Sequence, residues 1–249
     1  MTVPAETLQP LQWDADIASA AALIADSTRA AILRALLPDR PLAAGELARM
    51  AGVSAATASF HLAKLLEGCL ITVIRQGRHR YYRLAGHEVA AALEALGLIS
   101  PGLPVRSLRQ SREAAALAEA RTCYDHLAGR AGVEVLDGLL RQGLLEEKSG
   151  RTDRGGTSTH RFEVTGAGAK ELGSFGLNLL QLRRSRRQFA GTCIDWTQRR
   201  RHLNGALAAA ITSRMFELGW IERGQRRRSV RVTPVGIEGL ASTFGVDLP

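Results

Sequence analysis

The sequence predicts a mainly α-helical fold with small β-hairpins, an α+β chain of two domains. Helix start and stop residues recur at helical spacing between residues 26 and 67. Two short runs rich in β-branched and aromatic residues, 71–75 and 80–84, follow on either side of Gly77. Beyond residue 120, two stretches of similar sequence succeed each other, and each alternates helical and strand patterns. These three observations define the predicted class.

Length and composition fit a folded protein. The 249 residues are 45% hydrophobic and 23% charged, and domains usually hold roughly 100–200 residues. No apolar stretch approaches the roughly 20 residues that cross a bilayer, and the N-terminus lacks the pattern of a signal peptide. We therefore expect a cytoplasmic protein without a membrane partner. The three cysteines, Cys69, Cys123 and Cys193, are widely spaced and do not make a disulfide framework.

The net charge of +9 indicates a polyanionic partner. Residues 1–100 contain nine basic and nine acidic side chains, so the whole excess belongs to residues 101–249. Part of it stands in arginine runs at 183–187, 199–201 and 226–228. These runs either add a basic surface for DNA or form a solvated face with internal ion pairs.

The first elements predict a helix, a tight turn and a second helix. Asp26 or Ser27 can cap the first helix of the region. A short helix, a turn at Gly52 and a longer helix capped by Ser54 follow. The hairpin over 71–84 then completes a helix-turn-helix with a β wing, which is a winged helix.

Three segments of this region carry a family resemblance. In order, they are LIADSTRAAIL at the first helix, GVSAATASFHLAKL across the turn and the recognition helix, and GRHRYYRLAG across the wing. Their ordered combination, over about residues 22–96, resembles the arsenic-repressor (ArsR) superfamily of bacterial winged-helix transcription factors. The resemblance implies a dimer built from the first and last helices of this domain. It also implies a repressor that leaves its operator when it binds an inducer.

One face of the recognition helix is expected to lie in the major groove of DNA. Ala58, Leu62, Leu65 and Leu66 form the inward stripe of this helix. The expected DNA-binding residues of the helix are Ser54, Ala56, Thr57, Ser59, Phe60, His61 and Lys64. At the tip of the wing the expected DNA-binding residues are Arg78, His79 and Arg80. They suit a narrow minor groove, and the alternative is a solvated hairpin end.

Two residues of that face leave alternatives open. Phe60 either meets thymine methyl groups or packs against its own wing. His61 either donates to a phosphate or is a buried group that holds the recognition helix to the wing.

The metal-ligand sets of the resembling family are missing from this domain. The helix before the recognition helix reads GELARMAG, without a thiol or an imidazole, and the last helix offers only His87, Glu88 and Glu94. Cys69 follows the recognition helix and is expected to be a buried, inert thiol. Sensing is therefore expected elsewhere in the chain.

The last half of the chain contains a duplication. RTCYDHLAG and GTCIDWTQRRRHLNG share T-C-x-D and H-L-x-G, with six extra residues in the second segment, and VTGAGAKEL pairs with VTPVGIEGL further on. We expect two winged-helix-like copies, at about 121–180 and 191–249, packed about a pseudo-twofold axis. Each copy is expected to begin with a helix that carries T-C-x-D and to continue as strand, loop, strand and helix. A DNA-binding and dimerisation domain at 1–98, with a linker and connecting helix at 99–120, precedes this sensor domain of residues 121–249.

The duplication also repeats chemistry. The candidate ligand-sensing residues are Cys123, Tyr124, His126, Cys193, Trp196 and His202. Thiol and imidazole groups suit zinc or another soft ion, aromatic groups suit an organic inducer, and the sequence assigns neither cofactor. Alternatively the cysteines are core residues, the histidines are satisfied buried groups, and Asp125 and Asp195 cap helices. In either case the two T-C-x-D segments are expected to lie close together between the copies.

The sequence thus predicts a homodimeric DNA-binding repressor that leaves an inverted-repeat operator when a signal binds its C-terminal domain. One alternative is a DNA-architectural protein without an inducer. Another is a thiol- or metal-responsive sensor that uses Cys123 and Cys193. An enzyme is not expected, because the sequence has no nucleotide-binding loop, HExxH motif or nucleophile elbow.

Overall fold

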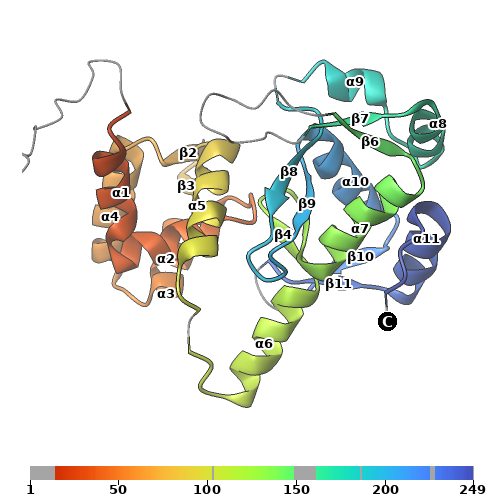
Figure 1. The fold of residues 1–249 in the computed structure, drawn as a ribbon. Coiled ribbons are helices and arrows are strands. Elements are labelled where there is room, and N and C mark those ends of the chain that lie inside the picture. The colour runs from red at the N-terminus through yellow and green to blue at the C-terminus, as the bar shows by residue number, and fades with distance from the viewer. Residues whose placement is uncertain (1–14, 103, 149–160, 186, 225–227, 249) are drawn as a thin grey trace, which may run out of the picture. The chain divides into compact units, whose positions relative to one another are not determined.

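The computed structural model confirms the predicted class, a mainly helical fold with small antiparallel sheets (Figure 1). The structure describes residues 15–102, 104–148, 161–185, 187–224 and 228–248. The chain forms two compact units. The first runs to Ala35 and from Pro41 to Ala85, and the second comprises residues 36–40 and 86–249. None of the described helices is both long and apolar enough to cross a membrane.

The first unit is a winged helix. Its elements are α1 (Ile17–Ala25), α2 (Ser27–Leu36), β1 (Leu42–Ala43), α3 (Ala44–Ala51), α4 (Ala55–Glu67), β2 (Ile71–Gln76) and β3 (His79–Leu84). Asp26 and Ser54 cap α2 and α4, since each side chain accepts a hydrogen bond from the backbone N–H three residues on. Gly52 adopts a left-handed φ of 69° and thereby turns the chain from α3 into α4. The sequence therefore predicts this part of the fold correctly.

The core of the first unit comes from α2, α3, α4 and the inner side of the wing. Its almost fully buried side chains include Ile32, Leu33, Leu47, Leu62, Leu65, Ile71 and Leu84. Each such burial stabilises the fold by roughly 1.5–3 kcal/mol. Strands β2 and β3 pair over six residues, and β1 adds to β3 to give the order β1-β3-β2. Gly77 and Arg78 form the two-residue tip of the wing, where Gly77 has a φ of 59°.

The second unit opens with two helices, α5 (His87–Ile99) and α6 (Leu108–Glu119). The sequence places the end of the DNA-binding domain at residue 98, whereas the structure groups α5 with the second unit. Glu94 gives a physical reason. Its side chain is only 6% exposed and forms ion pairs with Arg121 and Arg228 of the second unit.

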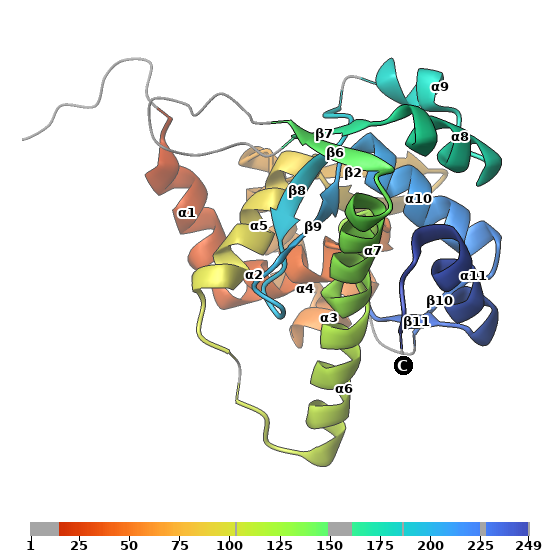
Figure 2. The ribbon, with the colours of Figure 1, turned by 45° about the vertical axis from the view of Figure 1, so that its right-hand side comes forward.

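Two copies of a hairpin, a helix, a second hairpin and a further helix follow (Figure 2). The first copy contains β4 (Arg121–Cys123), β5 (His126–Ala128), α7 (Gly129–Arg141), β6 (Leu145–Lys148), β7 (Arg161–Val164), α8 (Gly166–Ser174) and α9 (Leu179–Arg183). The second contains β8 (Gly191–Ile194), β9 (Arg201–Asn204), α10 (Ala206–Glu217), β10 (Ile221–Arg223), β11 (Val230–Val232) and α11 (Pro234–Phe244). The sheet β6-β7-β8-β9 joins the copies, while β4-β5 and β10-β11 stay two-stranded.

The expectation that T-C-x-D lies on a helix is wrong. In both copies these residues begin a β-hairpin, with Cys123 directly opposite His126 and Cys193 directly opposite His202. The first hairpin closes through two residues, of which Tyr124 has a positive φ of 60°. The second hairpin keeps the same cysteine–histidine register. The six extra residues of the second copy therefore lengthen only its loop.

The two copies pack across each other. Helix α7 of the first copy contacts β9 of the second, and α10 of the second contacts β5 of the first, as Figure 2 shows for α7. The glycine of each H-L-x-G motif, Gly129 and Gly205, turns the strand into its helix with a φ of 76° and 95°. A Cβ on Gly129 would lie 2.9 Å from the Ala118 carbonyl oxygen, so glycine is required there for both space and conformation.

Candidate functional site

The outward side of α4 offers a polar surface for the major groove. Ala58, Leu62 and Leu65 are buried against the core, as the apolar stripe predicts, and Leu66 is half-buried. The exposed expected residues of the helix are Ser54, Ala56, Thr57, Ser59, Phe60 and Lys64. The Ser54 and Thr57 hydroxyls are 2.8 Å apart, so the capping residue also fixes the exposed side chain of Thr57.

The structure bears on the open alternatives for two residues of the recognition helix. Phe60 does not pack into the wing: it is 57% exposed, and the Lys64 ammonium lies 4.7 Å from its ring centre. His61 is half-buried and faces away from the exposed side, with Nδ1 3.5 Å from a carboxylate oxygen of Asp26. This position favours the structural alternative for His61, although its neighbour is the start of α2 and not the wing.

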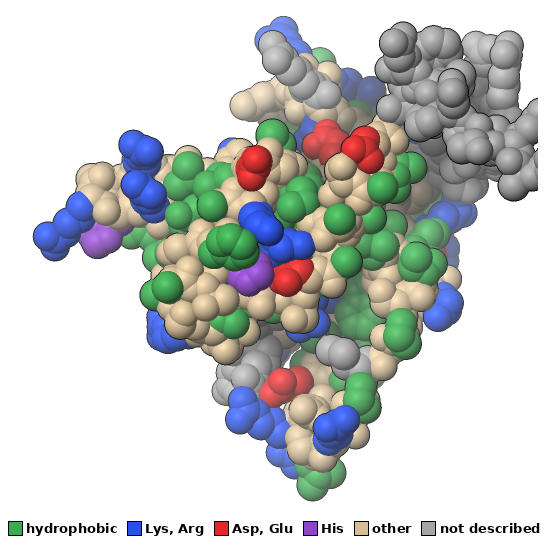
Figure 3. All heavy atoms as spheres, turned by 90° about the vertical axis from the view of Figure 1, so that its left-hand side faces the viewer, with side chains coloured by type: hydrophobic (Ala, Val, Ile, Leu, Met, Phe, Trp, Pro, Cys, Tyr) green, Lys and Arg blue, Asp and Glu red, His purple; other side chains and the backbone are tan. Residues whose placement is uncertain are grey.

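The wing carries the basic groups that the sequence predicts. Arg78, His79 and Arg80 are all exposed, and Arg75 stands directly opposite Arg80 across the hairpin. Like charges opposite each other destabilise a hairpin unless a counter-charge is supplied. No acidic side chain of the described residues forms an ion pair with any of these three arginines. Figure 3 shows the resulting cluster of basic groups and one histidine on the projecting end of the unit.

A second candidate site lies where the two N-terminal hairpins of the copies meet. Cys123, His126, Cys193 and His202 come together there, and one potential ligand atom from each lies within 4.8 Å of the others. The two imidazole rings stack with centres 5.2 Å apart. Cys193 is half-buried and the other three are buried. The expected proximity of the two T-C-x-D segments is thus confirmed, although through hairpins rather than helices.

The groups of this cluster sit in different protonation environments. The hydrogen bond with Cys193, together with burial, raises the pKa of Cys123. The same hydrogen bond and His126 lower the pKa of Cys193 to about 3. Burial, with the charge of His126, lowers the pKa of His202 to about 3. Cys193 is therefore the more acidic of the two thiols, and His202 is the less basic of the two imidazoles.

The other expected sensing residues lie beside the cluster. Tyr124 occupies the turn of the first hairpin. Trp196 is 36% exposed and packs against Gly97 of α5 and over the Arg121 guanidinium, 4.8 Å from the ring centre. Cys69 is exposed, contrary to the expectation of a buried thiol, and its φ of 55° marks it as the left-handed residue that ends α4.

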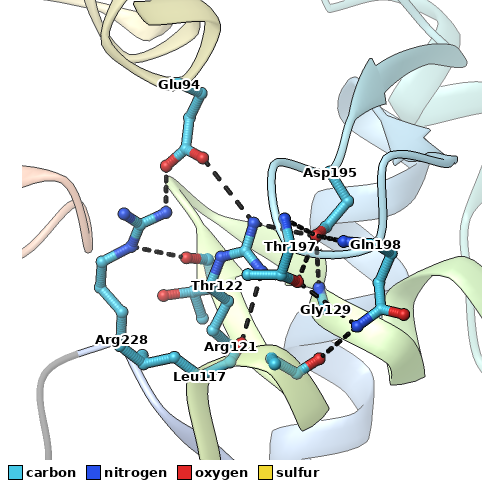
Figure 4. Close-up of polar contacts among 10 residues, drawn as sticks. Glu94, Leu117, Arg121, Thr122, Gly129, Asp195, Thr197, Gln198 and Arg228 are labelled. Atoms are coloured by element: carbon cyan, nitrogen blue, oxygen red, sulfur yellow. Dashed lines mark hydrogen bonds and ion pairs between the residues drawn. The ribbon is translucent and has the colours of Figure 1, made fainter. Parts of the chain in front are cut away.

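Next to the cluster, a buried ion network connects both copies with α5 (Figure 4). The Arg121 guanidinium, itself fully buried, lies 2.9 Å from Asp195 and 3.9 Å from Glu94. Arg228 pairs with the other oxygen of Glu94 and donates to the Thr122 carbonyl at 3.0 Å. Arg121 precedes Thr122 and Cys123 in one hairpin, and Asp195 follows Cys193 by two residues in the other. The network thus joins the strands of the cluster to α5.

Asp195 is the centre of this network, not a helix cap of its own copy. Its carboxylate accepts hydrogen bonds from the backbone N–H groups of Gly129, Thr197 and Gln198, at 2.6, 2.8 and 2.9 Å. Burial alone would raise its pKa, but the charge of Arg121 and these hydrogen bonds lower it. Asp125 lies in the turn of the other hairpin and forms an ion pair with Arg187. One of its carboxylate oxygens is 3.2 Å from His126 Nδ1.

Sequence reasoning missed the role of this network. The sequence does not single out Arg121, and it offers Glu94 only as one of too few metal ligands. One signal was present: the first copy reads Arg-Thr-Cys where the second reads Gly-Thr-Cys. Arg121 of the first copy thus aligns with Gly191 of the second. Where two similar copies differ by a charged residue, that residue makes an interaction that only one copy has.

The arginine runs are largely engaged within the chain. Arg200 pairs with Glu134 and Asp137, and Arg201 pairs with Glu147. Residues 186, 226 and 227 of these runs lie outside the described residues. The described part of the runs therefore gives little support to a second DNA-binding surface.

An organic ligand has little room between the helices of the two copies. The cavity lined by Leu127, Val135, Leu203, Ile211, Met215 and their neighbours measures about 10 Å³. This volume holds about one water molecule, whereas pockets for small molecules measure roughly 300–1,000 Å³.

Comparison with known proteins gives related sequences and structures. A family described as a helix-turn-helix domain matches residues 24–74. The HTH-type transcriptional regulator YdfF of Bacillus subtilis (strain 168) is 44% identical over 221 residues, 89% of this chain and 93% of that protein.

Among solved structures, a fragment of Mb0332 from Mycobacterium bovis is described as a homodimeric winged helix-turn-helix domain and a possible ArsR-family regulator. It is 31% identical, with a TM-score of 0.31, over 33% of this chain and 76% of its own. NolR from Sinorhizobium fredii is 30% identical, with a TM-score of 0.32, over 35% of this chain and 86% of its own. The match to the Bacillus protein is longer than the first unit and so extends into the second.

Proposed function

The chain belongs to the helix-turn-helix transcriptional regulators, and from this premise we propose that it is a dimeric repressor of the ArsR type with a built-in sensor. It is a DNA-binding regulator and not an enzyme. In the proposal it reads an inverted-repeat operator and leaves that operator when a signal reaches its second unit.

The exposed faces of α4 and the wing carry this proposal. The Ser54 hydroxyl orients the Thr57 side chain, which is exposed and can reach base edges. Lys64 is also exposed on this helix. On the wing, the facing pair Arg75 and Arg80 lacks an acidic partner among the described residues. A phosphate backbone supplies the missing counter-charge, because arginine binds phosphate oxygens bidentately.

The helix α1 supports a dimer. Its sequence is IASAAALIA, yet none of its nine residues is buried in the protomer, and Ile17 is 73% exposed. A helix that is apolar on all sides is normally covered by other protein. A second copy supplies that cover in the proposal, in line with the ArsR-type dimer built from the first and last helices of the domain. A two-fold dimer requires half-sites about one helical turn apart.

The position of Glu94 supports regulation from the second unit. Glu94 lies on α5, the helix that directly follows the wing in the chain, and its two oxygens face Arg121 and Arg228. A change in the hairpins that carry Arg121 and Asp195 therefore alters the contacts of α5. Such a change shifts DNA affinity only if the signal binds the two dimer conformations with different affinity.

The test is selection of binding sites from random duplex DNA by the full-length protein, with its mass in solution measured by analytical ultracentrifugation. The proposal expects a dimer and an inverted repeat with half-sites about one turn, or roughly 10 base pairs, apart. A monomer both free and on DNA, or a selection without any enriched motif, would contradict it.

A further inference from the structure

We propose that Cys123, His126, Cys193 and His202 form a site for one metal ion of the zinc class, bound by two sulfur and two nitrogen atoms. The proposal deepens the proposed function and rests on it only for the role of the ion as a signal. Binding of the ion itself follows from the local geometry.

The spacing of the four groups fits a four-coordinate ion. Each residue offers one ligand atom, and all four atoms lie within 4.8 Å of one another. A tetrahedral zinc ion, with bonds of about 2.0–2.3 Å, separates its ligands by about 3.3–3.8 Å. Only a small contraction of the cluster therefore brings the four atoms onto a single ion.

The two histidines are not satisfied as core residues. His126 Nε2 and both ring nitrogens of His202 are buried without a hydrogen-bond partner in the described structure. Buried polar atoms are nearly always paired, because an unpaired one costs about 1–3 kcal/mol. An ion at the cluster supplies a partner for one nitrogen of each ring, which the alternative of inert core side chains does not.

The surroundings of the cluster resemble the outer shell of a metal site. His126 Nδ1 lies 3.2 Å from Asp125, which Arg187 holds in place, so Nε2 is the nitrogen left for an ion. A carboxylate behind a metal-binding histidine fixes its tautomer and orientation. Asn204 Nδ2 lies 2.9 Å from the Cys193 sulfur and donates to it. Both contacts prepare ligand atoms for a cation.

The chemistry of the four ligands selects the class of ion. Two thiols and two imidazoles suit Zn²⁺ and other borderline or soft ions, whereas Mg²⁺ and Ca²⁺ require oxygen ligands. Each copy contributes one cysteine and one histidine, so the ion links the two hairpins. The half-buried Cys193 gives the ion a path from solvent.

The experiment uses full-length protein, stripped with a chelator under reducing conditions and titrated with Co²⁺. We expect one Co²⁺ per chain, with the intense ligand-field bands of tetrahedral coordination and a thiolate-to-cobalt charge-transfer band, and displacement by Zn²⁺. Native mass spectrometry should show one Zn²⁺ per chain. Zn²⁺ should also raise the Tm of the wild-type protein, a readout that needs no variant.

Three variants sharpen the test. Cys193→Ser should lower Co²⁺ affinity more than the roughly 10–100-fold that loss of an outer-shell partner costs, and Asp125→Asn should fall within that range. Cys69→Ser removes an exposed thiol of the other unit and should bind like the wild type. Circular dichroism checks that each variant is folded.

Absence of tetrahedral Co²⁺ bands and of bound Zn²⁺ in the wild type would overturn the site, as would a Cys123–Cys193 disulfide that forms equally with and without Zn²⁺. DNA binding by the metal-free protein is measured on the same samples. A chain that binds DNA but no ion contradicts the site alone, and a chain that binds the ion but no DNA contradicts the proposed function alone.

Discussion

Replacing Asp195 with Asn should strongly destabilise the second unit. The Asp195 carboxylate and the Arg121 guanidinium are both fully buried and lie 2.9 Å apart. Asn keeps one oxygen, but its amide nitrogen then faces donors in either orientation. At the Oδ2 position it meets Arg121 and the Gly129 N–H, and at the Oδ1 position it meets the Thr197 and Gln198 N–H groups. Removal of one partner from a buried ion pair costs about 3–5 kcal/mol.

The magnitude follows from what remains around Arg121. Glu94, 3.9 Å from the guanidinium, offers partial compensation, so we expect the lower end, about 3 kcal/mol of unfolding free energy. For a domain of 150–250 residues, 1 kcal/mol shifts Tm by roughly 2–4 °C, so the expected loss is about 6–12 °C.

The assay is urea and thermal unfolding of the full chain in a Trp13→Phe background. Fluorescence then reports on Trp196 and Trp220, both in the second unit. Asp137→Asn is the matched control. Asp137 lies on α7 and forms a partly exposed ion pair with Arg200, so its loss should cost at most about 1 kcal/mol of unfolding free energy. If Asp195→Asn costs no more than Asp137→Asn, the buried network does not hold the two copies and α5 together.

Three further changes test the DNA-binding unit. Thr57→Ala should relax base preference at one position of each half-site by about 1–3 kcal/mol, measured by competition between operator variants; unchanged preference would remove Thr57 as a base reader. Arg78→Ala should weaken binding to all sequences and reduce the salt slope by about 1.8 per dimer, since each phosphate contact contributes about 0.9 and two wings bind; an unchanged slope would mean that the wing tip stays in solvent. Ile17→Asp, at a 73% exposed position of α1, should leave the fold of each protomer intact but shift the monomer–dimer equilibrium toward monomer in sedimentation. If the variant dimerises as tightly as the wild type, the interface lies elsewhere.

Local signals in the sequence were sufficient for the first unit. The caps Asp26 and Ser54, the turn at Gly52 and the wing tip at Gly77 each act within a few residues, so the sequence alone predicts them. The orientation of His61 was not accessible in this way. Its neighbour Asp26 is distant in sequence and is brought close only by the packing of α2 against α4.

The candidate sensor was predictable in composition but not in local structure. Each hairpin strand there has only three or four residues, and Tyr124 rather than glycine supplies the positive φ of the first turn. Short strands with an unusual turn residue give no clear periodicity. The repeat nevertheless predicted the meeting of Cys123 and Cys193, because similar segments pack with equivalent faces together. The partners Glu94 and Arg228 could not be predicted, since 134 positions separate them.

The most direct test of the account is operator affinity with and without metal. Fluorescence anisotropy of the selected operator is measured with metal-free, reduced full-length protein and again with one equivalent of Zn²⁺. The account predicts that Zn²⁺ raises Kd by about 5–150-fold, the usual range of allosteric coupling, in the wild type and in Cys69→Ser but not in Cys193→Ser. An unchanged Kd, with one Zn²⁺ per chain seen by native mass spectrometry, would contradict regulation of DNA binding from the cysteine–histidine cluster.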